Sequence, residues 1–317
     1  MNRYKKLKKL GQGAHGTVYL YEYIGEEAAV SSSDDSPLNI KYTPNRPKQH
    51  STLKCGDKVA IKHIKLKDYK LGLSYDCIRE LNILQDLPSN PFILSILDVF
   101  LDQEDTICIV LEYIETDLEQ LINDKQIILQ MNEIKNILLM LLQSIEHLHS
   151  NYVLHRDIKP TNILVSKHSR DYTIRLADFG LARSFACINR GLSPQSCTLW
   201  YRAPELLFGS DSYGPSSDIW SVGCVFAQLL LRAPLFPGSS ELDQLSRIVS
   251  VLGNPTAWPG IDTLPNYLTF SEINPTPFST LFPAASKHAL DLLQSMLTYN
   301  PHDRISAANA LSHPFFA

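Results

Sequence analysis

The eight residues His155-Arg156-Asp157-Ile158-Lys159-Pro160-Thr161-Asn162 decide the fold, and Asp178-Phe179-Gly180 follows them along the chain. Within this stretch a carboxylate, Asp157, stands close to an ammonium group, Lys159. Asn162 and Asp178 add oxygen-bearing side chains of the kind that Mg²⁺ prefers as ligands. A pattern this specific predicts one chemical site rather than four unrelated surface residues.

A glycine-rich stretch lies near the start of the chain: Leu10, Gly11, Gln12, Gly13, Ala14, His15, Gly16, Thr17 and Val18. Its glycines let the backbone approach phosphate oxygens without a Cβ in the way, and Val18 can cover a base. Similar glycine spacing occurs in dinucleotide-binding folds, where a helix follows at once. Here residues 17–20 continue as a predicted strand, which favours a loop that covers a nucleotide.

Lys62 lies at the end of the apolar run Val59-Ala60-Ile61-Lys62. A lysine in a strand is usually just solvated, so its interpretation depends on a partner. Glu80, on the predicted helix that follows, is the obvious one. An ion pair between them would hold Lys62 against the α- and β-phosphates of a nucleotide.

These groups together match the needs of phosphoryl transfer, in which the protein contributes positioning and charge more than covalent chemistry. Asp157 is predicted to accept the proton of the attacking hydroxyl. Lys159 would neutralise the transferred group, and Asn162 with Asp178 would bind Mg²⁺.

The order of predicted elements indicates an α+β fold, with a small β-rich part at residues 1–113 and a larger helical part at 114–317. Residues 25–56 show almost no hydrophobic periodicity and are predicted to be a long surface loop or a disordered insertion. The expected strands are 17–23, 58–64 and 107–113, and the expected helices are about 74–87, 131–150, 216–231 and a last one ending near 312–314.

Composition excludes several classes of protein. The 317 residues carry 33 acidic and 29 basic side chains, a formal charge of −4, which argues against direct nucleic-acid binding and against a basic membrane-surface protein. The start of the chain does not read as a signal peptide, and the apolar stretches are too short or interrupted to span a bilayer. Six scattered cysteines fit a reducing compartment. We expect an intracellular protein without a disulfide framework or a metal cage.

The ordered motifs resemble those of the eukaryotic protein kinases over nearly the whole chain, with residues 25–56 as an interruption. The motifs are Gly11, Gly13, Gly16, Lys62, Glu80, the stretch 155–162, Asp178-Phe179-Gly180, Ala203-Pro204-Glu205, Asp218 and Arg304. The resemblance implies a bilobal kinase fold, with a β-rich N-lobe that carries one regulatory helix and a mainly helical C-lobe. It also implies ATP as the phosphoryl donor and Mg²⁺ as the metal.

The resemblance further implies where the nucleotide binds. The adenine is expected between the lobes, with Leu111 behind it, hydrogen bonds to the backbone of Glu112 and Ile114, and Asp117 near the ribose. Glu205 is implied to pair with Arg304, and Asp218 to anchor the catalytic loop. The implied ATP-binding set is residues 10–18 together with Ala60, Lys62, Glu80, Glu112, Ile114, Asp117, Leu164 and Asp178.

The sequence also indicates which branch of the family the chain resembles. Lys159 together with Thr198 resembles the serine/threonine kinases, and Trp200-Tyr201-Arg202-Ala203-Pro204-Glu205 resembles the cyclin-dependent and mitogen-activated kinases. That group prefers a proline after the target hydroxyl, and Arg202 is expected to line the proline pocket. Short similarities such as Glu115-Thr116-Asp117-Leu118-Glu119 favour the subfamily that activates other cyclin-dependent kinases and serves transcription factor TFIIH.

This subfamily implies partners and a location. We expect a cyclin subunit, with the H type one candidate, and an assembly factor or TFIIH as a further candidate. The expected substrates are proteins, such as the RNA polymerase II C-terminal tail or other cyclin-dependent kinases. The expected location is the nucleus, and otherwise the cytoplasm.

The activation segment carries Ser193 where relatives have a phosphorylated threonine. Three arginines, Arg79, Arg156 and Arg183, would repel one another if they converged there, and a phosphate would relieve that repulsion and order the loop. The alternative is that these arginines pair with acids such as Glu205, Asp211 or Glu115. The inhibitory Thr-Tyr pair of cell-cycle kinases is replaced here by Ala14 and His15, which excludes that route of inhibition.

Two other readings stay open. A kinase of the cell-cycle or mitogen-activated type would carry most of the same motifs. A catalytically dead kinase fold could act as a scaffold, although such proteins typically lose a residue equivalent to Lys62, Asp157 or Asp178, and all three stand here.

Overall fold

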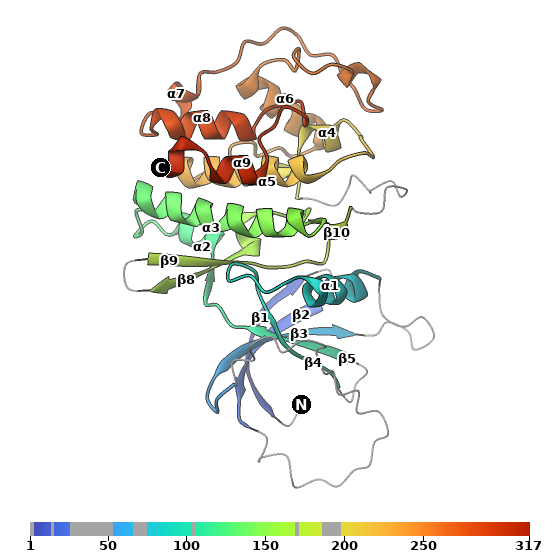
Figure 1. Cartoon of the computed structure of the whole chain (residues 1–317), viewed down its shortest axis with the longest axis vertical. Coiled ribbons are helices and arrows are strands. Elements are labelled where there is room, and N and C mark those ends of the chain that lie inside the picture. Colours follow the sequence, from blue (N-terminus) through green and yellow to red (C-terminus); the bar gives the residue numbers. More distant parts are fainter. Residues whose placement is uncertain are drawn as a thin grey trace. The chain divides into compact units, whose positions relative to one another are not determined.

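The computed structural model describes residues 3–13, 16–25, 53–65, 75–102, 106–168, 171–185 and 198–317. The chain forms two compact units, Met1–Ile114 and Glu115–Ala317 (Figure 1). Most of the predicted insertion at 25–56, the residues Ala14 and His15, and the predicted phosphorylation site Ser193 lie outside the described residues.

Unit 1 is built on a five-stranded antiparallel sheet whose strand order is β1-β2-β3-β5-β4. Alternation of side chains along β3 sends Val59 and Ile61 to one face, where they pack with Tyr21 and Cys108. The strands and the one helix of the unit are β1 Tyr4–Gly13, β2 Gly16–Tyr23, β3 Lys58–Lys65, β4 Ile96–Asp102, β5 Thr106–Glu112 and α1 Tyr75–Asp86.

Unit 2 is mainly helical. Its helices are α2 Leu118–Asn123, α3 Met131–Ser150, α4 Pro204–Leu207, α5 Pro215–Leu231, α6 Glu241–Leu252, α7 Phe278–Leu281, α8 Lys287–Met296 and α9 Ala307–Leu311. Short strands complete it: β6 Thr116–Asp117, β7 Val153–Leu154, β8 Ile163–His168, β9 Asp171–Leu176 and β10 Arg183–Ser184.

Helix α5 is the centre of the unit 2 core, because every residue from Ser217 to Leu229 is buried. A helix that is apolar nearly all round requires neighbours on every side. Helix α3 packs along α5 and on α9 (Figure 1). This packing fixes the end of α3, from which the chain turns through Asn151 and Tyr152 into β7 and then the 155–162 stretch.

Side-chain caps fix the starts of several helices. Ser240 accepts a hydrogen bond from the amide of Asp243 at the start of α6, and Ser286 and Ser306 do the same for α8 and α9. Such caps satisfy amides that have no partner within the helix, typically for about 1 kcal/mol each.

The predicted elements and the observed ones agree for the long, strongly periodic segments. The helix predicted at 131–150 is α3, and the helix predicted at 216–231 begins one residue earlier as α5. The part after residue 113 is mainly helical, as expected, but the sequence did not predict the antiparallel hairpin of β8 and β9 that lies there. Within the described part of the chain, no helix is both long and apolar enough to cross a membrane.

Candidate active site

Lys62 and Glu80 form a buried ion pair in unit 1. Lys62 Nζ lies 2.8 Å from Glu80 Oε1 and 2.7 Å from Oε2, and both residues are less than a tenth exposed. Strand β3 places Lys62 between Val18 on β2 and Ile109 on β5, and α1 carries Glu80. Because a lysine in such an apolar setting needs a counter-charge, Glu80 fixes where its ammonium group lies. The contact predicted from the sequence forms.

The glycine stretch joins the first two strands. Strand β1 runs to Gly13 and β2 begins at Gly16, whose φ of 138° favours glycine. A Cβ on Gly16 would lie 2.4 Å from the carbonyl oxygen of His63, so a side chain cannot fit. Leu10, on β1, is 40% exposed.

The other residues expected to contact the nucleotide lie on several elements. In unit 1, Ala60 on β3 pairs in register with Leu111 on β5, and Glu112 ends β5 opposite Val59. In unit 2, Asp117 on β6 pairs in register with Leu164 on β8. The Asp117 carboxylate also caps α2, where it accepts hydrogen bonds from the backbone amide and the side chain of Gln120.

Asp157 is the centre of a buried polar cluster in unit 2. Its Oδ2 accepts hydrogen bonds from Lys159 Nζ at 2.7 Å and from Asn162 Nδ2 at 2.9 Å. Its Oδ1 accepts from the Thr198 hydroxyl at 3.2 Å, and that hydroxyl accepts from Lys159 Nζ at 3.0 Å. The backbone amide of Thr198 also donates to Oδ1, at 3.4 Å. Four groups from two distant segments therefore hold the carboxylate in one orientation, with only 5% of Asp157 exposed.

A second carboxylate, Asp218 on α5, holds the backbone of this stretch. Its Oδ2 accepts from the amide of His155 and its Oδ1 from the amide of Arg156, each at 2.9 Å. His149, in the last turn of α3, contacts Oδ2 through Nε2 at 3.0 Å. Arg156 has a φ of 69°, a strained backbone conformation that these contacts stabilise.

His155 connects Asp157 to the strand that precedes Asp178. Its Nδ1 accepts from the amide of Asp157 at 3.3 Å, and its Nε2 lies 3.1 Å from the carbonyl oxygen of Ala177. Since one nitrogen accepts from an N–H group and the other faces an acceptor, this geometry fits a neutral imidazole protonated at Nε2. The imidazole ring also packs edge-on against Phe179.

The pKa of Asp218 predicts how the site responds to acid. Burial alone would raise that pKa. The hydrogen bond and the charge of His149, together with the hydrogen bond from the backbone amide of Arg156, outweigh burial and hold the pKa below its ordinary value. A group whose pKa is lowered by folding stabilises the fold above its ordinary pKa of about 3.9. That stabilisation is lost as the pH falls through the lower folded-state value.

We therefore expect Asp218→Asn to lower the free energy of unfolding by about 1–3 kcal/mol at neutral pH. The deficit should stay constant down to about pH 5 and shrink below about pH 4, because the unfolded wild type takes up a proton on Asp218 there while the folded carboxylate is still ionised. Urea unfolding at a series of pH values measures this, with the exposed Asp262→Asn as the control. A deficit that does not change down to pH 3 would contradict the assignment.

Asn162 and Asp178 lie at the same end of the β8–β9 hairpin. Ile163 pairs with Leu176, and the amide of Ala177 donates to the carbonyl oxygen of Asn162 at 2.9 Å. Asn162 uses its Nδ2 for both of its hydrogen bonds to Asp157, which leaves its amide oxygen for a cation. Asp178 is exposed, with a φ of 62°. An amide oxygen and an exposed carboxylate are a donor set that fits Mg²⁺.

The arginines predicted to gather around a phosphate are described only in part. Arg156 lies over the ring of Tyr213, 5.6 Å from its centroid, and Arg183 donates to the carbonyl oxygen of Ala182. The side chain of Arg79 and the residue Ser193 lie outside the described part of the structure. Glu205, offered by the sequence as an alternative partner for these arginines, instead pairs with Arg304.

Arg202, predicted to line a proline pocket, is buried, and its Nη1 lies 2.5 Å from Glu241 Oε1 at the start of α6. The neighbouring Trp200 donates its indole N–H to the carbonyl oxygen of Gly238.

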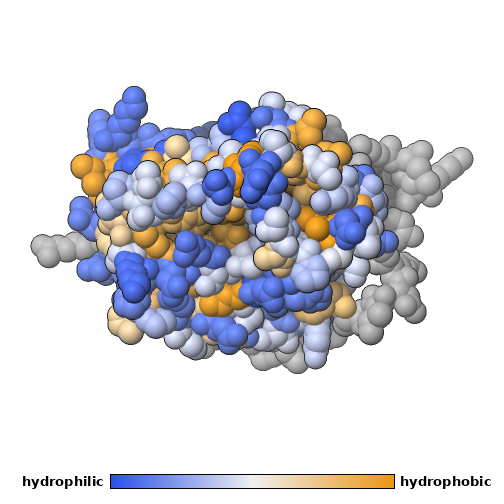
Figure 2. All heavy atoms as spheres, turned by 90° about the horizontal axis from the view of Figure 1, so that it is seen from above, coloured by the Kyte–Doolittle hydropathy of each residue, from blue (hydrophilic) through white to orange (hydrophobic). Residues whose placement is uncertain are grey.

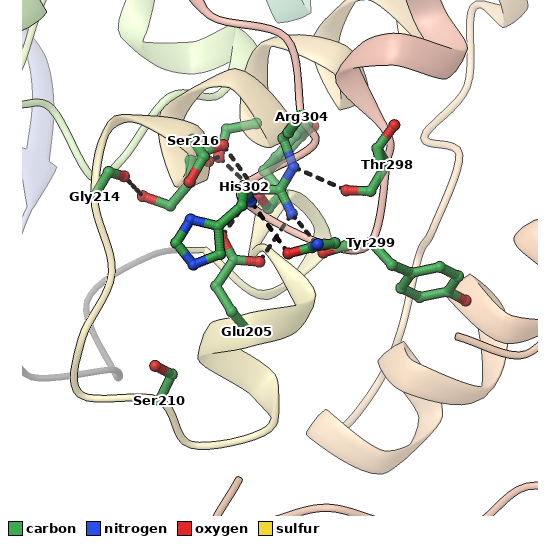
Figure 3. Close-up of polar contacts among 12 residues, drawn as sticks. Glu205, Ser210, Gly214, Ser216, Thr298, Tyr299, His302 and Arg304 are labelled. Carbon is green, nitrogen blue, oxygen red and sulfur yellow. Dashed lines mark hydrogen bonds and ion pairs between the residues drawn. The ribbon is translucent and has the colours of Figure 1, made fainter. Parts of the chain in front are cut away.

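The ion pair of Glu205 and Arg304 is the most deeply buried one described (Figure 3). Arg304 Nη1 donates to Glu205 Oε1 at 2.8 Å and Nη2 to Oε2 at 2.9 Å, so the pair is bidentate. The guanidinium also donates to the carbonyl oxygens of Ser216, Thr298 and Tyr299. This pair, which the resemblance implied, fixes α4, and with it the segment that leads from Thr198.

Sequence reasoning missed three members of the site: His149, Tyr213 and Glu241. Each lies outside the short motifs and is brought in only by tertiary contact. A signal existed for His149, because it is a histidine in the last turn of a predicted helix directly before the 155–162 stretch.

Comparisons with known proteins agree with this geometry. The family model of the protein kinase domain matches residues 48–316. Cyclin-dependent kinase 7 of Dictyostelium discoideum is 50% identical over 247 residues, 77% of this chain and 67% of that protein. The probable serine/threonine-protein kinase KIN28 homolog of Encephalitozoon cuniculi is 40% identical over 319 residues, 100% of this chain and 96% of that protein. A chain in the solved structure of the CAK complex from Chaetomium thermophilum bound to ATP-γ-S has 36% identity and a TM-score of 0.81, covering 99% of this chain and 91% of that one.

Proposed function

This chain belongs to the protein kinase family, among its cyclin-dependent kinases. We propose that it activates other cyclin-dependent kinases and works in transcription, as the TFIIH-associated subfamily does. It is a serine/threonine protein kinase that uses ATP. Its proposed substrates are serine or threonine residues followed by proline, in the RNA polymerase II C-terminal tail or in other cyclin-dependent kinases. The observation that carries the proposal is the oriented carboxylate of Asp157, which four donor groups hold in place.

Asp157 is proposed to orient the substrate hydroxyl and accept its proton as the new O–P bond forms. A carboxylate can do this only if an oxygen faces the hydroxyl, and the bonds from Thr198 and Asn162 fix its plane. The ammonium group of Lys159, 2.7 Å from Oδ2, adds a third contact that holds the carboxylate.

Lys159 is proposed to neutralise charge on the transferred phosphoryl group. It is about a quarter exposed, so its ammonium group can reach a ligand, whereas its contacts with Asp157 and Thr198 limit where that group lies. Oriented positive charge at this point stabilises the transition state of phosphoryl transfer.

Asn162 and Asp178 are the residues proposed to hold Mg²⁺. When bound, this ion would neutralise the phosphate oxygens of ATP. The chain keeps the two oxygen donors at one end of the β8–β9 hairpin. The hydrogen bond from the amide of Ala177 to the carbonyl oxygen of Asn162 holds them there. The nucleotide itself is proposed to contact the glycine stretch, Ala60 and Lys62 of unit 1, and Asp117 and Leu164 of unit 2.

Lys62→Ala should lower kcat/KM by about 10²-fold or more, since it removes an oriented cation from the α- and β-phosphates. Glu80→Gln should act in the same direction, because it replaces the carboxylate that fixes the Lys62 ammonium group with a neutral amide. Steady-state kinetics with a Ser-Pro peptide measure both effects. Lys58→Ala, an exposed lysine on the same strand, is the matched control and should keep the wild-type rate. A Lys62→Ala rate within twofold of wild type would refute the role.

The partners proposed for this chain are a cyclin, with the H type as the first candidate, and an assembly factor or TFIIH. Its proposed location is the nucleus. Ser193 is proposed to accept an activating phosphate held by Arg79, Arg156 and Arg183. These proposals rest on similarity to cyclin-dependent kinase 7 and to a chain of the CAK complex.

A pull-down of the tagged chain from native extract tests the proposed assembly. Recovery of a cyclin together with TFIIH components, identified by mass spectrometry, is the expected result. Recovery of a cell-cycle cyclin without TFIIH components would favour the cell-cycle alternative instead. Asp262→Asn, an exposed residue far along the chain from the catalytic stretch, should recover the same partners and serves as a control for folding.

A further inference from the structure

Unit 2 contains a cavity of about 490 Å³ that none of the groups discussed above uses. It lies at the end of α6, against residues 275–278 and the residues that follow α8. Figure 2 views the molecule from the side of α6, α7 and α8, and shows hydrophobic surface in hollows between hydrophilic side chains. A volume of this order is that of a typical ligand pocket.

The walls of the cavity are tied together by hydrogen bonds. The phenol of Tyr299 donates to the carbonyl oxygen of Gly253 at 2.8 Å, and the amide of Thr276 donates to Val251 at 2.9 Å. Asn254 accepts from the amide of Ile273 at 2.6 Å. These bonds join the end of α6 to the loop on one side and to the segment after α8 on the other.

One wall is also anchored to the most deeply buried ion pair described. Arg304 donates to the carbonyl oxygens of Thr298 and Tyr299, at 3.0 and 3.1 Å, while it holds Glu205 (Figure 3). The Tyr299 side chain points away from that pair (Figure 3). The cavity is therefore pre-formed, so a ligand would not have to pay for ordering it.

The lining combines apolar surface with polar groups at the rim. Leu252, Pro277, Phe278 and Leu297 supply apolar surface. The side-chain amides of Asn254 and Asn300 form hydrogen bonds within the fold and fix the rim. Gln294 adds a side-chain amide, which can both donate to and accept from a peptide backbone.

The cavity lining carries negative charge only, among the described residues. Among the described residues that line the cavity, Asp303 is the only charged one. It is exposed and accepts a hydrogen bond from Asn300 Nδ2 at 2.7 Å. A carboxylate can accept several hydrogen bonds, so Asp303 keeps capacity for a cationic group of a ligand.

We propose that this cavity binds an extended peptide segment of a protein partner, with an apolar side chain in the cavity and an arginine or lysine beside Asp303. A pre-formed, mainly apolar site with the Gln294 amide and the Asp303 carboxylate in its lining suits a peptide that contributes one or two side chains. The single negative charge selects a basic segment over an acidic one.

Helix α6 separates this cavity from the proposed substrate contacts. Its first residue, Glu241, holds Arg202, whereas its last, Leu252, lines the cavity. Twelve residues of helix span about 17 Å. A peptide in the cavity should therefore leave phosphorylation of a short Ser-Pro peptide unchanged.

The test uses the full chain and synthetic nonapeptides that carry one Leu or Phe anchor, with Arg, Gln or Glu at each flanking position. Fluorescence anisotropy is expected to find saturable binding, strongest for peptides with Arg and weakest for those with Glu. Asp303→Asn should weaken the best Arg peptide about two- to fivefold, as for an exposed ion pair, and leave its Gln counterpart unchanged.

A second variant blocks the cavity without removing any contact of the fold. Ala257 is exposed at the rim, and Ala257→Arg should weaken every binding peptide at least tenfold through bulk and like charge. Asp262→Asn, an exposed acid outside the lining, should leave binding as in wild type. No preference for Arg over Glu, or binding that survives both Asp303→Asn and Ala257→Arg, would overturn the proposal.

Discussion

Asp157→Asn is expected to lower kcat by about 10²–10⁴-fold, the contribution typical of a positioned general base. An asparagine can keep the hydrogen bond from Thr198, but it cannot accept a proton and it carries no charge to pair with Lys159. KM for ATP should change little, because Asp157 is proposed to act on the hydroxyl and not on the nucleotide. Steady-state kinetics on a Ser-Pro peptide, with the chain bound to its cyclin, measure both constants.

The matched control is Asp171→Asn, which changes an exposed aspartate at the start of β9. It should keep the wild-type kcat. A normal rate from Asp157→Asn would remove the role assigned to Asp157. A thermal melt should show both variants folded, because an asparagine keeps the size and shape of Asp157 and one acceptor oxygen for Thr198.

Glu205→Ala is expected to lower the free energy of unfolding of unit 2 by about 3–5 kcal/mol. The substitution leaves the guanidinium of Arg304 buried without a counter-charge, although three carbonyl oxygens still accept from it. Removing one partner of a buried pair costs more than the pair contributes, since the remaining charge stays away from water. Chemical denaturation measures the loss.

The control for this prediction is the exposed pair of Asp243 and Arg247, one helical turn apart on α6. Arg247→Ala should cost less than about 0.5 kcal/mol, because water already solvates both charges. A Glu205→Ala deficit as small as that of Arg247→Ala would contradict the buried role of the pair.

The local chemistry of the site could be predicted from the sequence where the residues stand close together. Asp157, Lys159 and Asn162 belong to one short stretch, so their types and spacing already imply a shared site. The pair of Lys62 and Glu80 followed from the need of a strand lysine for a counter-charge. The pair of Glu205 and Arg304 followed from family resemblance alone, because 99 positions separate the two residues.

What the sequence could not predict depends on tertiary contact. His149 contacts Asp218 only because α3 packs along α5. No sequence pattern in either helix predicts that packing. The hairpin of β8 and β9 was missed because each strand has only six residues and one of them ends in the polar run Ser166-Lys167-His168. Short strands like these are stabilised by their pairing rather than by intrinsic preference.

The direct test of the central claim is transfer of the γ-phosphate of ATP by the chain bound to its cyclin. Two peptides serve as substrates: a heptad repeat of the RNA polymerase II tail and the activation loop of another cyclin-dependent kinase. The account predicts that both are phosphorylated at a serine or threonine followed by proline, and that Asp157→Asn abolishes both reactions. Intact assembly with the cyclin but no phosphate transfer to either peptide would contradict it and favour a scaffold.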